Sequence, residues 1–305
     1  MMETAVVVGN CQAKGLEIQL ARRSGFAERF EIVSFPAVHE IPDGQIPTLH
    51  EAVHRAALVF LQTVDDEYRG GIGLGHAYLA SIAGSATVLR WPSVYWAGYV
   101  PDLFYLKDSS GATVVRAPFD YHDRVVLSGF ARGDSVEETC VALADPERPS
   151  DALAKLELTT AELAVRSEGC DLGVSDFIAE KFRDELLFYT MNHPSNSLMS
   201  FLADEALDLL DIPSGDCSSN AGAVDLLSST FYPLHANHVK QLGLEFGEGI
   251  CADGENPFRI RGAQLSPLEA VSRFFEYYRS HRELVEINLE RTDSGQDFGG
   301  TNGIA

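Results

Sequence analysis

The stretch AVVVGNCQAKGLEIQL, residues 5–20, decides the fold class of this chain. It begins with consecutive β-forming apolar side chains that end at Gly9, which is the pattern of a buried strand. Leu16 and Leu20 then share one face of a helix that the spacing predicts over residues 13–26. A buried strand that turns directly into an amphipathic helix is typical of an α/β protein.

The same alternation continues along the N-terminal part of the chain. The pattern predicts strands over residues 30–35, 57–62 and 86–93, and helices over residues 46–56 and 72–83. Strands and helices that alternate at such short intervals predict a parallel sheet with helices on its faces. Sheets of this kind bind ligands beyond the carboxyl ends of their strands, where the loops into the following helices gather.

From about residue 150 the pattern becomes helical, with the last predicted helix opening at a Ser266 capping box. The fold class we expect is α/β: an N-terminal parallel sheet with flanking helices, followed by a mainly α-helical C-terminal part. We expect the α/β region over residues 1–148, a helical region packed on it as one unit over residues 149–290, and a loose tail over residues 291–305. Within the helical region the predicted helices cover residues 150–167, 174–191, 195–210 and 266–289.

Composition and charge narrow the class of protein. Apolar residues make up 45% of the chain and charged residues 22%, as in a soluble globular protein. The sequence shows neither a membrane-length apolar run nor a secretory leader, so we expect a cytoplasmic protein without membrane insertion. The net charge of −22 argues against nucleic acid as a partner.

Cysteine and histidine spacing gives no strong metal signal. The five cysteines are far apart and form no CxxC pair, so we expect neither a disulfide framework nor a zinc site. His235 and His238, three residues apart, make only a weak pair, and we predict no metal.

The GNCQ turn at residues 9–12 is the first candidate for chemistry. A thiol in the first turn of a helix feels the positive end of the helix dipole, which favours thiolate. Unpaired backbone N–H groups there, with the amides of Asn10 and Gln12, would suit an oxyanion. The alternative is that Cys11 is a small buried residue that merely fits a tight turn.

The second candidate is LFYTMNHPSNSLM, residues 187–199, where we expect one helix to end and another to begin. An imidazole on a rigid turn between packed helices is well placed to take a proton from a thiol or hydroxyl. The alternative is a structural role, which a lone histidine such as His193 has more often.

An aromatic segment, RWPSVYWAGYVPDLFYL at residues 90–106, offers a wall on which a sugar or an adenine would stack, although core packing explains most of its aromatics. The glycine-rich residues 68–78 lack a phosphate-binding motif, so we interpret them as a flexible loop from which Arg69 would reach a phosphate. The chain has no GxSxG sequence, which argues against the usual α/β-hydrolase.

Five motifs in order, VVVGNCQ, WPSVYWAGYVPD, DYHD, VSDFIAEKFRDELLFYTMNHPSN and YPLHANHVKQLGL, resemble the WcbI-type polysaccharide biosynthesis family. The resemblance implies a coenzyme A-binding acetyltransferase of capsule and cell-surface polysaccharide synthesis, with Cys11 and His193 at the reaction centre. It implies acetyl-CoA and a sugar or polysaccharide acceptor as partners, with a polysaccharide-assembly complex as a further possible partner. We assign catalytic roles to Cys11, His193, Gln12 and Asn10, cofactor contacts to Gly9, Lys14, Arg69, Arg90, Asn192 and Asn196, and sugar contacts to Tyr95, Tyr99, Asp102 and His122.

Two alternatives stay open at this point. The chain also resembles SGNH-type esterases, which place a nucleophile after the first strand and a histidine in a late His-Pro motif. Thr190 stands where those enzymes carry an aspartate, which leaves a Cys11–His193 dyad rather than a triad. The other alternative is a non-catalytic scaffold that binds a glycan or nucleotide through the aromatic segment.

Overall fold

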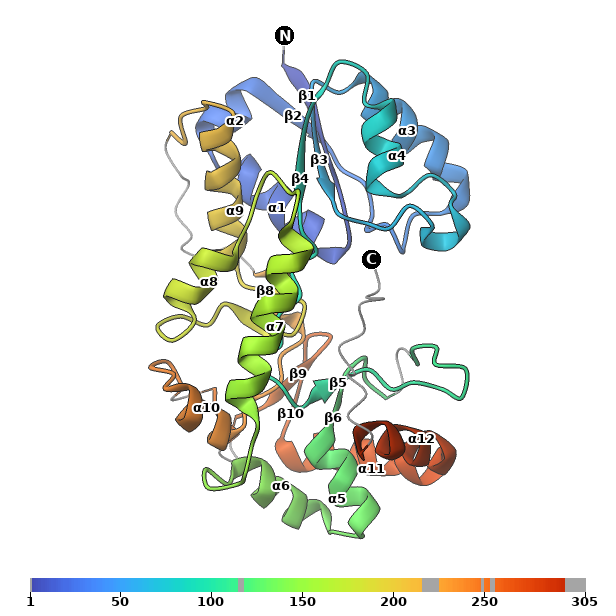
Figure 1. The fold of residues 1–305 in the computed structure, drawn as a ribbon, viewed down its shortest axis with the longest axis vertical. Helices are drawn as coiled ribbons and strands as arrows, with labels where there is room; N and C mark the ends of the chain where they lie inside the picture. The colour runs from blue at the N-terminus through green and yellow to red at the C-terminus, as the bar shows by residue number, and fades with distance from the viewer. Residues whose placement is uncertain (1, 115–117, 216–224, 248–249, 253–255, 294–305) are drawn as a thin grey trace.

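The computed structural model describes residues 2–114, 118–215, 225–247, 250–252 and 256–293. It confirms the α/β class, with a four-stranded parallel sheet in the N-terminal part and mainly helices after it (Figure 1). The strand order is β2-β1-β3-β4, formed by β1 (Glu3–Val8), β2 (Phe30–Val33), β3 (Leu58–Gln62) and β4 (Thr87–Trp91). The helices between them are α1 (Cys11–Ala21), α2 (Ser24–Arg29), α3 (Ile46–Arg55) and α4 (His76–Ile82).

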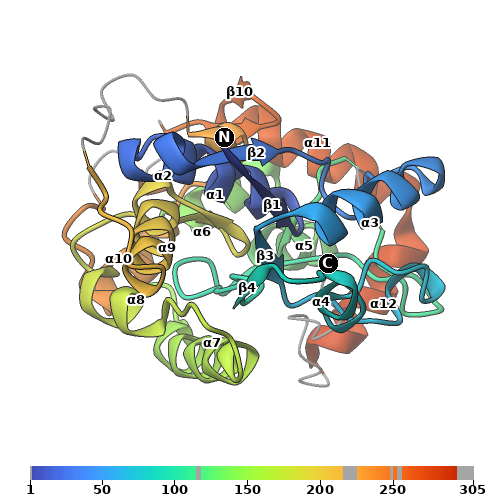
Figure 2. The same cartoon turned by 90° about the horizontal axis from the view of Figure 1, so that it is seen from above.

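Both faces of the sheet are buried, which explains why its strands are apolar throughout rather than alternating. Val6 and Val59 pack toward α3 and α4 in one hydrophobic cluster. Val7 and Phe60 belong to the other cluster, on the opposite face, with α1, α2 and the later helix α9 (Asn196–Leu209). Figures 1 and 2 show these two groups of helices on either side of the sheet.

The second part of the chain forms the other end of the molecule (Figure 1). Its helices are α5 (Arg124–Arg132), α6 (Val136–Ala144), α7 (Ala152–Ser167), α8 (Ser175–Lys181), α10 (Ala236–Leu242), α11 (Pro267–Ser280) and α12 (Arg282–Asp293). Three short antiparallel pairs join them: β5 (Leu103–Phe104) with β6 (His122–Asp123), β7 (Phe188–Thr190) with β8 (His193–Pro194), and β9 (Phe258–Ile260) with β10 (Ala263–Leu265). One hydrophobic cluster runs from the sheet to Phe274 and Tyr278 of α11, so the two parts share a core.

Several of the predicted helices have different limits. The helix predicted over residues 72–83 begins only at His76, as α4. The helix predicted over residues 13–26 divides between α1 and α2, and the one predicted over residues 266–289 divides at His281. The helix predicted over residues 174–191 is wrong in its second half, because α8 ends at Lys181 and β7 follows. The tail predicted over residues 291–305 lies mostly outside the described residues, and α12 extends to Asp293.

None of the helices in the described part of the chain combines the length and the apolarity needed to cross a bilayer.

Candidate active site at the carboxyl edge of the sheet

Cys11 is the first residue of α1 and follows the carboxyl end of β1. Asn10 caps the helix, since its Oδ1 accepts from the backbone N–H of Gln12 at 2.9 Å. Gly9 lets the chain pass close to β3, because a Cβ at this position would come within 2.9 Å of Gln62. The helix start therefore holds the sulfur at the edge of the sheet, where the sequence predicted it.

Gln12 fixes this turn against three other segments. Its Nε2 donates to the carbonyls of Val94 at 2.7 Å and Asn192 at 2.9 Å. Its Oε1 accepts from Gln62 Nε2 at 2.8 Å and from the backbone N–H of Val94 at 3.1 Å. Both amide donors are thus committed to carbonyls, so in this conformation Gln12 positions the turn and does not offer an N–H to an oxyanion.

The Gln12 contact to Asn192 brings the segment with His193 to the same edge. His193 does not lie on a turn between two helices, as predicted, but begins β8 of a short hairpin in which it pairs with Thr190. Phe188 and Thr190 are aromatic and β-branched, which favours strand over helix, and Leu187 accepts a hydrogen bond from the backbone N–H of Ser195.

Tyr121 joins the two halves of the site. Its hydroxyl donates to Asn192 Oδ1 at 2.6 Å and lies 3.3 Å from His193 Nε2. Cys11 lies close enough to Tyr121 and Tyr105 to act electrostatically on both phenols. Tyr121 therefore lies near both Cys11 and His193, the two residues that the sequence argument expected to meet at one edge of the sheet.

The charges of the site differ from the sequence expectation. Burial raises the pKa of the Cys11 thiol to about 11, and the opposing effect of the backbone N–H groups of Cys11 and Gln12 does not outweigh it. The predicted thiolate is therefore wrong for the free protein. Burial lowers the pKa of His193 to about 4, against smaller opposing effects of the Leu227 and Thr230 backbone, so the imidazole is neutral at pH 7.

The basic residues assigned to phosphate contacts are engaged within the protein. Lys14 pairs with Glu17 at 2.6 Å, and Arg90 on the edge strand β4 lies 3.5 Å from Asp171. Arg69 donates to the carbonyls of Val38 and Ile41, so it braces a loop at the same edge of the sheet as Gly9.

The residues assigned to sugar contacts lie apart from this edge or inside the core. The Tyr99 hydroxyl donates to the carbonyls of Phe182 and Glu185. His122 is fully buried against Tyr278. Full burial leaves Tyr99 and His122 no accessible surface for a sugar in this conformation.

The other assigned residues have mixed positions. Tyr95 is partly exposed beneath the Arg166 guanidinium, which lies 5.4 Å from its ring centroid. Asn196 is tied into the start of α9, since its N–H donates to Asp225 at 2.7 Å. Asp102 lies in a separate buried network with His235 and His238.

Sequence reasoning missed Tyr105, Tyr121 and Gln62 as members of the site. Tyr121 is part of the DYHD motif, which carried the family resemblance but no chemical prediction. Gln62 carried a weaker signal: it is a buried polar residue that closes an apolar strand.

A parallel sheet with a cysteine at the first helix start and a neutral histidine nearby defines an α/β protein with a cysteine–histidine site at the carboxyl edge of its strands. The family model of the polysaccharide biosynthesis enzyme WcbI matches residues 4–215, and the chain belongs to this family of polysaccharide biosynthesis enzymes.

A solved structure of WcbI, described as native protein without a disulfide bond between coenzyme A and one of its cysteines, is similar with a TM-score of 0.81. The similarity covers 98% of this chain and 97% of that chain at 22% sequence identity. At this identity the likeness shows a shared fold. No curated protein matches the chain.

Proposed function

We propose that this chain is a coenzyme A-dependent O-acetyltransferase that moves an acetyl group from acetyl-CoA to a sugar hydroxyl in surface or capsular polysaccharide biosynthesis. The observation that carries the proposal is the neutral His193 imidazole beside Tyr121, next to the Cys11 turn. Family membership and the coenzyme A named for the solved WcbI structure support the same reading.

In the proposed reaction His193 acts as general base, because its imidazole is neutral at pH 7 and one ring nitrogen can accept a proton. A sugar oxygen forms the new C–O bond to the acetyl carbon, the thioester C–S bond breaks, and the departing coenzyme A sulfur takes up the proton. Cys11 has one of two roles. It either accepts the acetyl group from coenzyme A and then passes it to the sugar, or it only lines the site as a polar side chain. Both routes leave the same products.

We infer that the backbone N–H of Cys11 is the donor for the tetrahedral oxyanion, because the neighbouring N–H groups are already bonded. Among the described residues, the N–H groups of Asn10, Gln12 and Ala13 bond within the protein, to Gln62, Asn10 Oδ1 and Asn10 O respectively. The N–H of Cys11 is oriented toward its own sulfur, where its hydrogen bond lowers the thiol pKa. A donor in this role is typically worth about 3 kcal/mol in the transition state.

No observation favours the esterase alternative over the transferase. Thr190 stands at the position of the esterase aspartate, and its hydroxyl donates to Asn192 Oδ1 at 3.2 Å. Among the described residues no carboxylate is hydrogen-bonded to His193, and its Nδ1 makes no hydrogen bond of good geometry. The site therefore differs from a Ser-His-Asp triad.

The test uses labelled acetyl-CoA with cell-derived polysaccharide precursors, comparing the natural chain with Cys11→Ala, Cys11→Ser and His193→Gln. Cys170→Ala is the matched control, because this partly buried thiol has its pKa raised to about 11 as well. We expect His193→Gln to lose at least about 100-fold in rate and Cys170→Ala to stay near the natural rate.

The cysteine variants separate the two routes. Labelled acetyl recovered on Cys11 by mass spectrometry, together with inactive Cys11→Ala, identifies an acyl-enzyme. Unchanged acetyl transfer in both Cys11→Ala and His193→Gln would reject the roles proposed for these two residues. No acetyl transfer by the natural chain, in spite of glycan or nucleotide binding, would reject the transferase and favour the scaffold. Release of acetate from an acetylated sugar, with no use of acetyl-CoA, would favour the esterase.

Binding is tested independently of turnover. A ligand that binds only the folded form raises the melting temperature with the logarithm of its saturation. Coenzyme A and acetyl-CoA should stabilise the chain more than ADP or ATP, and equal shifts for all four would count against a pantetheine-binding site near Cys11.

A further inference from the structure

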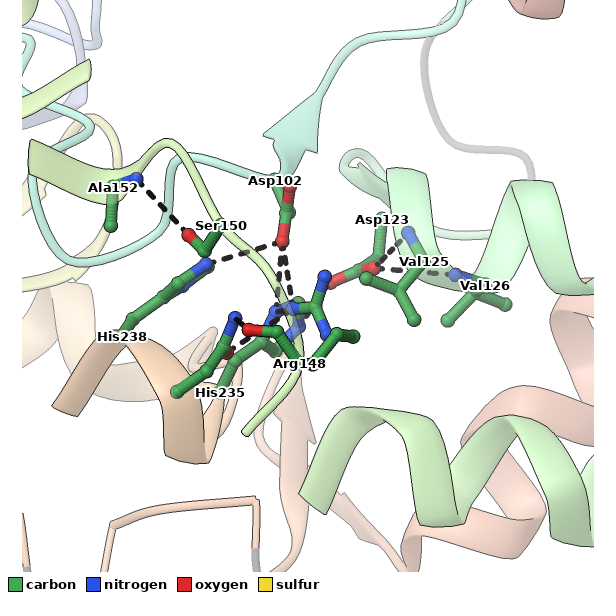
Figure 3. A network of polar contacts seen from close by, with 10 residues as sticks. Asp102, Asp123, Val125, Val126, Arg148, Ser150, Ala152, His235 and His238 are labelled. Carbon is green, nitrogen blue, oxygen red and sulfur yellow. Dashed lines mark hydrogen bonds and ion pairs between the residues drawn. The ribbon is translucent and has the colours of Figure 1, made fainter. Parts of the chain in front are cut away.

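A second buried polar cluster, away from the Cys11 turn, consists of Asp102, His235 and His238, here named the Asp102 cluster (Figure 3). Asp102 Oδ2 lies 3.0 Å from His235 Nδ1 and 3.3 Å from His238 Nε2. The three atoms lie within 4.8 Å of one another. Ligand atoms around a tetrahedral zinc ion are roughly 3.3 Å apart, given bonds of about 2.0–2.1 Å, so the two contacts to Asp102 have the spacing of metal ligands.

Two distant segments supply the cluster. Asp102 precedes β5, while His235 and His238 lie at the N-cap and in the first turn of α10. The spacing of three residues places both imidazoles at the start of one helix, with ring centroids 4.9 Å apart. A small cavity of about 10 Å³, lined by all three residues, adjoins them, and its volume is that of a single water-sized occupant.

Asp123 completes the arrangement behind His235. The Nε2 of His235 lies 2.8 Å from Asp123 Oδ2, and the other oxygen of Asp123 caps α5. A carboxylate that receives the far N–H of an imidazole fixes its tautomer and turns the other nitrogen toward a metal. Asp123 thus orients His235 Nδ1 toward Asp102, as an outer partner of a metal ligand does.

His238 gives a second, independent indication that the cluster binds an ion. Its side chain is 1% exposed, and neither ring nitrogen has a hydrogen-bond partner among the described residues. The 3.3 Å contact of Nε2 with Asp102 lacks the alignment of a hydrogen bond. Leaving a buried polar group unsatisfied destabilises the folded chain, and a coordinated cation would remove that cost at Nε2.

The guanidinium of Arg148 places a positive charge against the Asp102 cluster. Its Nη2 lies 2.7 Å from His235 Nδ1, 3.1 Å from Asp102 Oδ2 and 3.2 Å from Asn237 Oδ1. The contact with Arg148 requires a His235 Nδ1 without a proton, whereas the contact of Nδ1 with the Asp102 carboxylate requires a protonated one, so Nδ1 cannot satisfy both at once. Arg148 precedes α7 in a connecting segment, and its side chain is 20% exposed.

We propose that the Asp102 cluster binds one divalent cation of the zinc class through Asp102 Oδ2, His235 Nδ1 and His238 Nε2, in exchange for the Arg148 guanidinium. Two imidazoles and one carboxylate form a donor set that suits zinc and similar transition metals better than calcium or magnesium. The ion would tie α10 to β5 and, through Asp123, to α5. This inference does not depend on the proposed acetyl transfer.

The experiment measures zinc bound to the full chain, purified without a metal-affinity tag and treated with a chelator before Zn²⁺ is added back. Metal content after gel filtration gives the stoichiometry, and substitution by Co²⁺ gives a visible absorption band if the ion is four- or five-coordinate. The variants are His238→Gln, which removes a ligand, and Arg148→Met, which removes the competing cation but keeps the apolar stem. His54→Gln, at an exposed histidine of α3, controls for binding at the surface.

We expect one zinc per chain in the natural protein and in His54→Gln, with at least about tenfold weaker binding in His238→Gln. Arg148→Met should bind zinc more tightly than the natural chain. No stoichiometric zinc in the natural chain, or equal affinity in His238→Gln, would overturn the proposal and leave Arg148 as the resident cation. If His238→Gln does not fold, Arg148→Met decides alone, and an affinity no higher than natural would overturn the proposal.

Discussion

Replacement of Gln12 by alanine should destabilise the protein by about 4 kcal/mol. The side chain makes four buried hydrogen bonds, two as donor to Val94 O and Asn192 O and two as acceptor from Gln62 Nε2 and Val94 N. Each buried hydrogen bond contributes about 1 kcal/mol net, and the orphaned partners have no access to water. A loss of this size is a large fraction of the 5–15 kcal/mol by which folded domains are typically stable.

Urea unfolding followed by circular dichroism measures the effect. Gln12→Met keeps the length of the side chain without its hydrogen bonds, so it separates polar contacts from packing and should cost nearly as much as alanine. Gln241→Ala, at an exposed position of α10, is the control and should change stability by less than about 0.5 kcal/mol. If Gln12→Ala destabilised the chain by less than about 1 kcal/mol, the role of Gln12 as the junction of the site would be refuted.

Three further outcomes are expected. The free energy of unfolding should fall by up to about 3 kcal/mol between pH 6.5 and pH 4, because the unfolded chain takes up a proton at His193 that the folded chain, with its pKa near 4, refuses; His193→Gln should flatten that part of a pH-dependent urea titration. Iodoacetamide should modify Cys11 no faster than the other described cysteines at pH 7, because its pKa is about 11, and mass spectrometry of the native protein would expose a reactive thiolate if this is wrong. Gly9→Ala should lower stability by about 1–3 kcal/mol, since its Cβ would clash with the Gln62 side chain, whereas Gly44→Ala meets no atom within 4 Å and should melt as the natural protein does.

The sequence predicted the sheet well because its signals are local. Consecutive apolar residues such as those from Ala5 to Val8 encode a strand buried on both faces, and Ser266 encodes a helix start by its capping box. The second half of the helix predicted over residues 174–191 was wrong, because a short apolar run such as the one that includes Phe188 is compatible with either a helix or a strand. Pairing with β8 decided between them, and such pairing is not a local signal.

The sequence predicted that Cys11 and His193 would lie near the same edge of the sheet, but it did not predict their charge states. The helix-dipole argument considers only the first turn of α1, whereas the pKa of Cys11 is dominated by burial. Tyr121 entered the site through a contact with a residue 72 positions away. Desolvation, and contacts between residues far apart in the sequence, depend on the assembled fold. The spacing of apolar residues along the chain therefore cannot predict them.

The two shifts at the site move the pKa values apart for the same physical reason. Burial favours the uncharged form of both groups, which places Cys11 near 11 and His193 near 4, a gap of about 7 that corresponds to roughly 10 kcal/mol before mutual attraction is counted. These shifts disfavour a resident thiolate–imidazolium pair in the free protein. In the proposed acetyl transfer, His193 would then take its proton while the acetyl carbon is being attacked. We expect kcat/KM for acetyl transfer to be lower in D₂O than in H₂O, because the proton that His193 accepts is being transferred in the transition state. An equal kcat/KM in the two solvents, with chemistry shown to limit the rate, would mean that the proton moves in a separate step and that ligand binding first brings the two pKa values together.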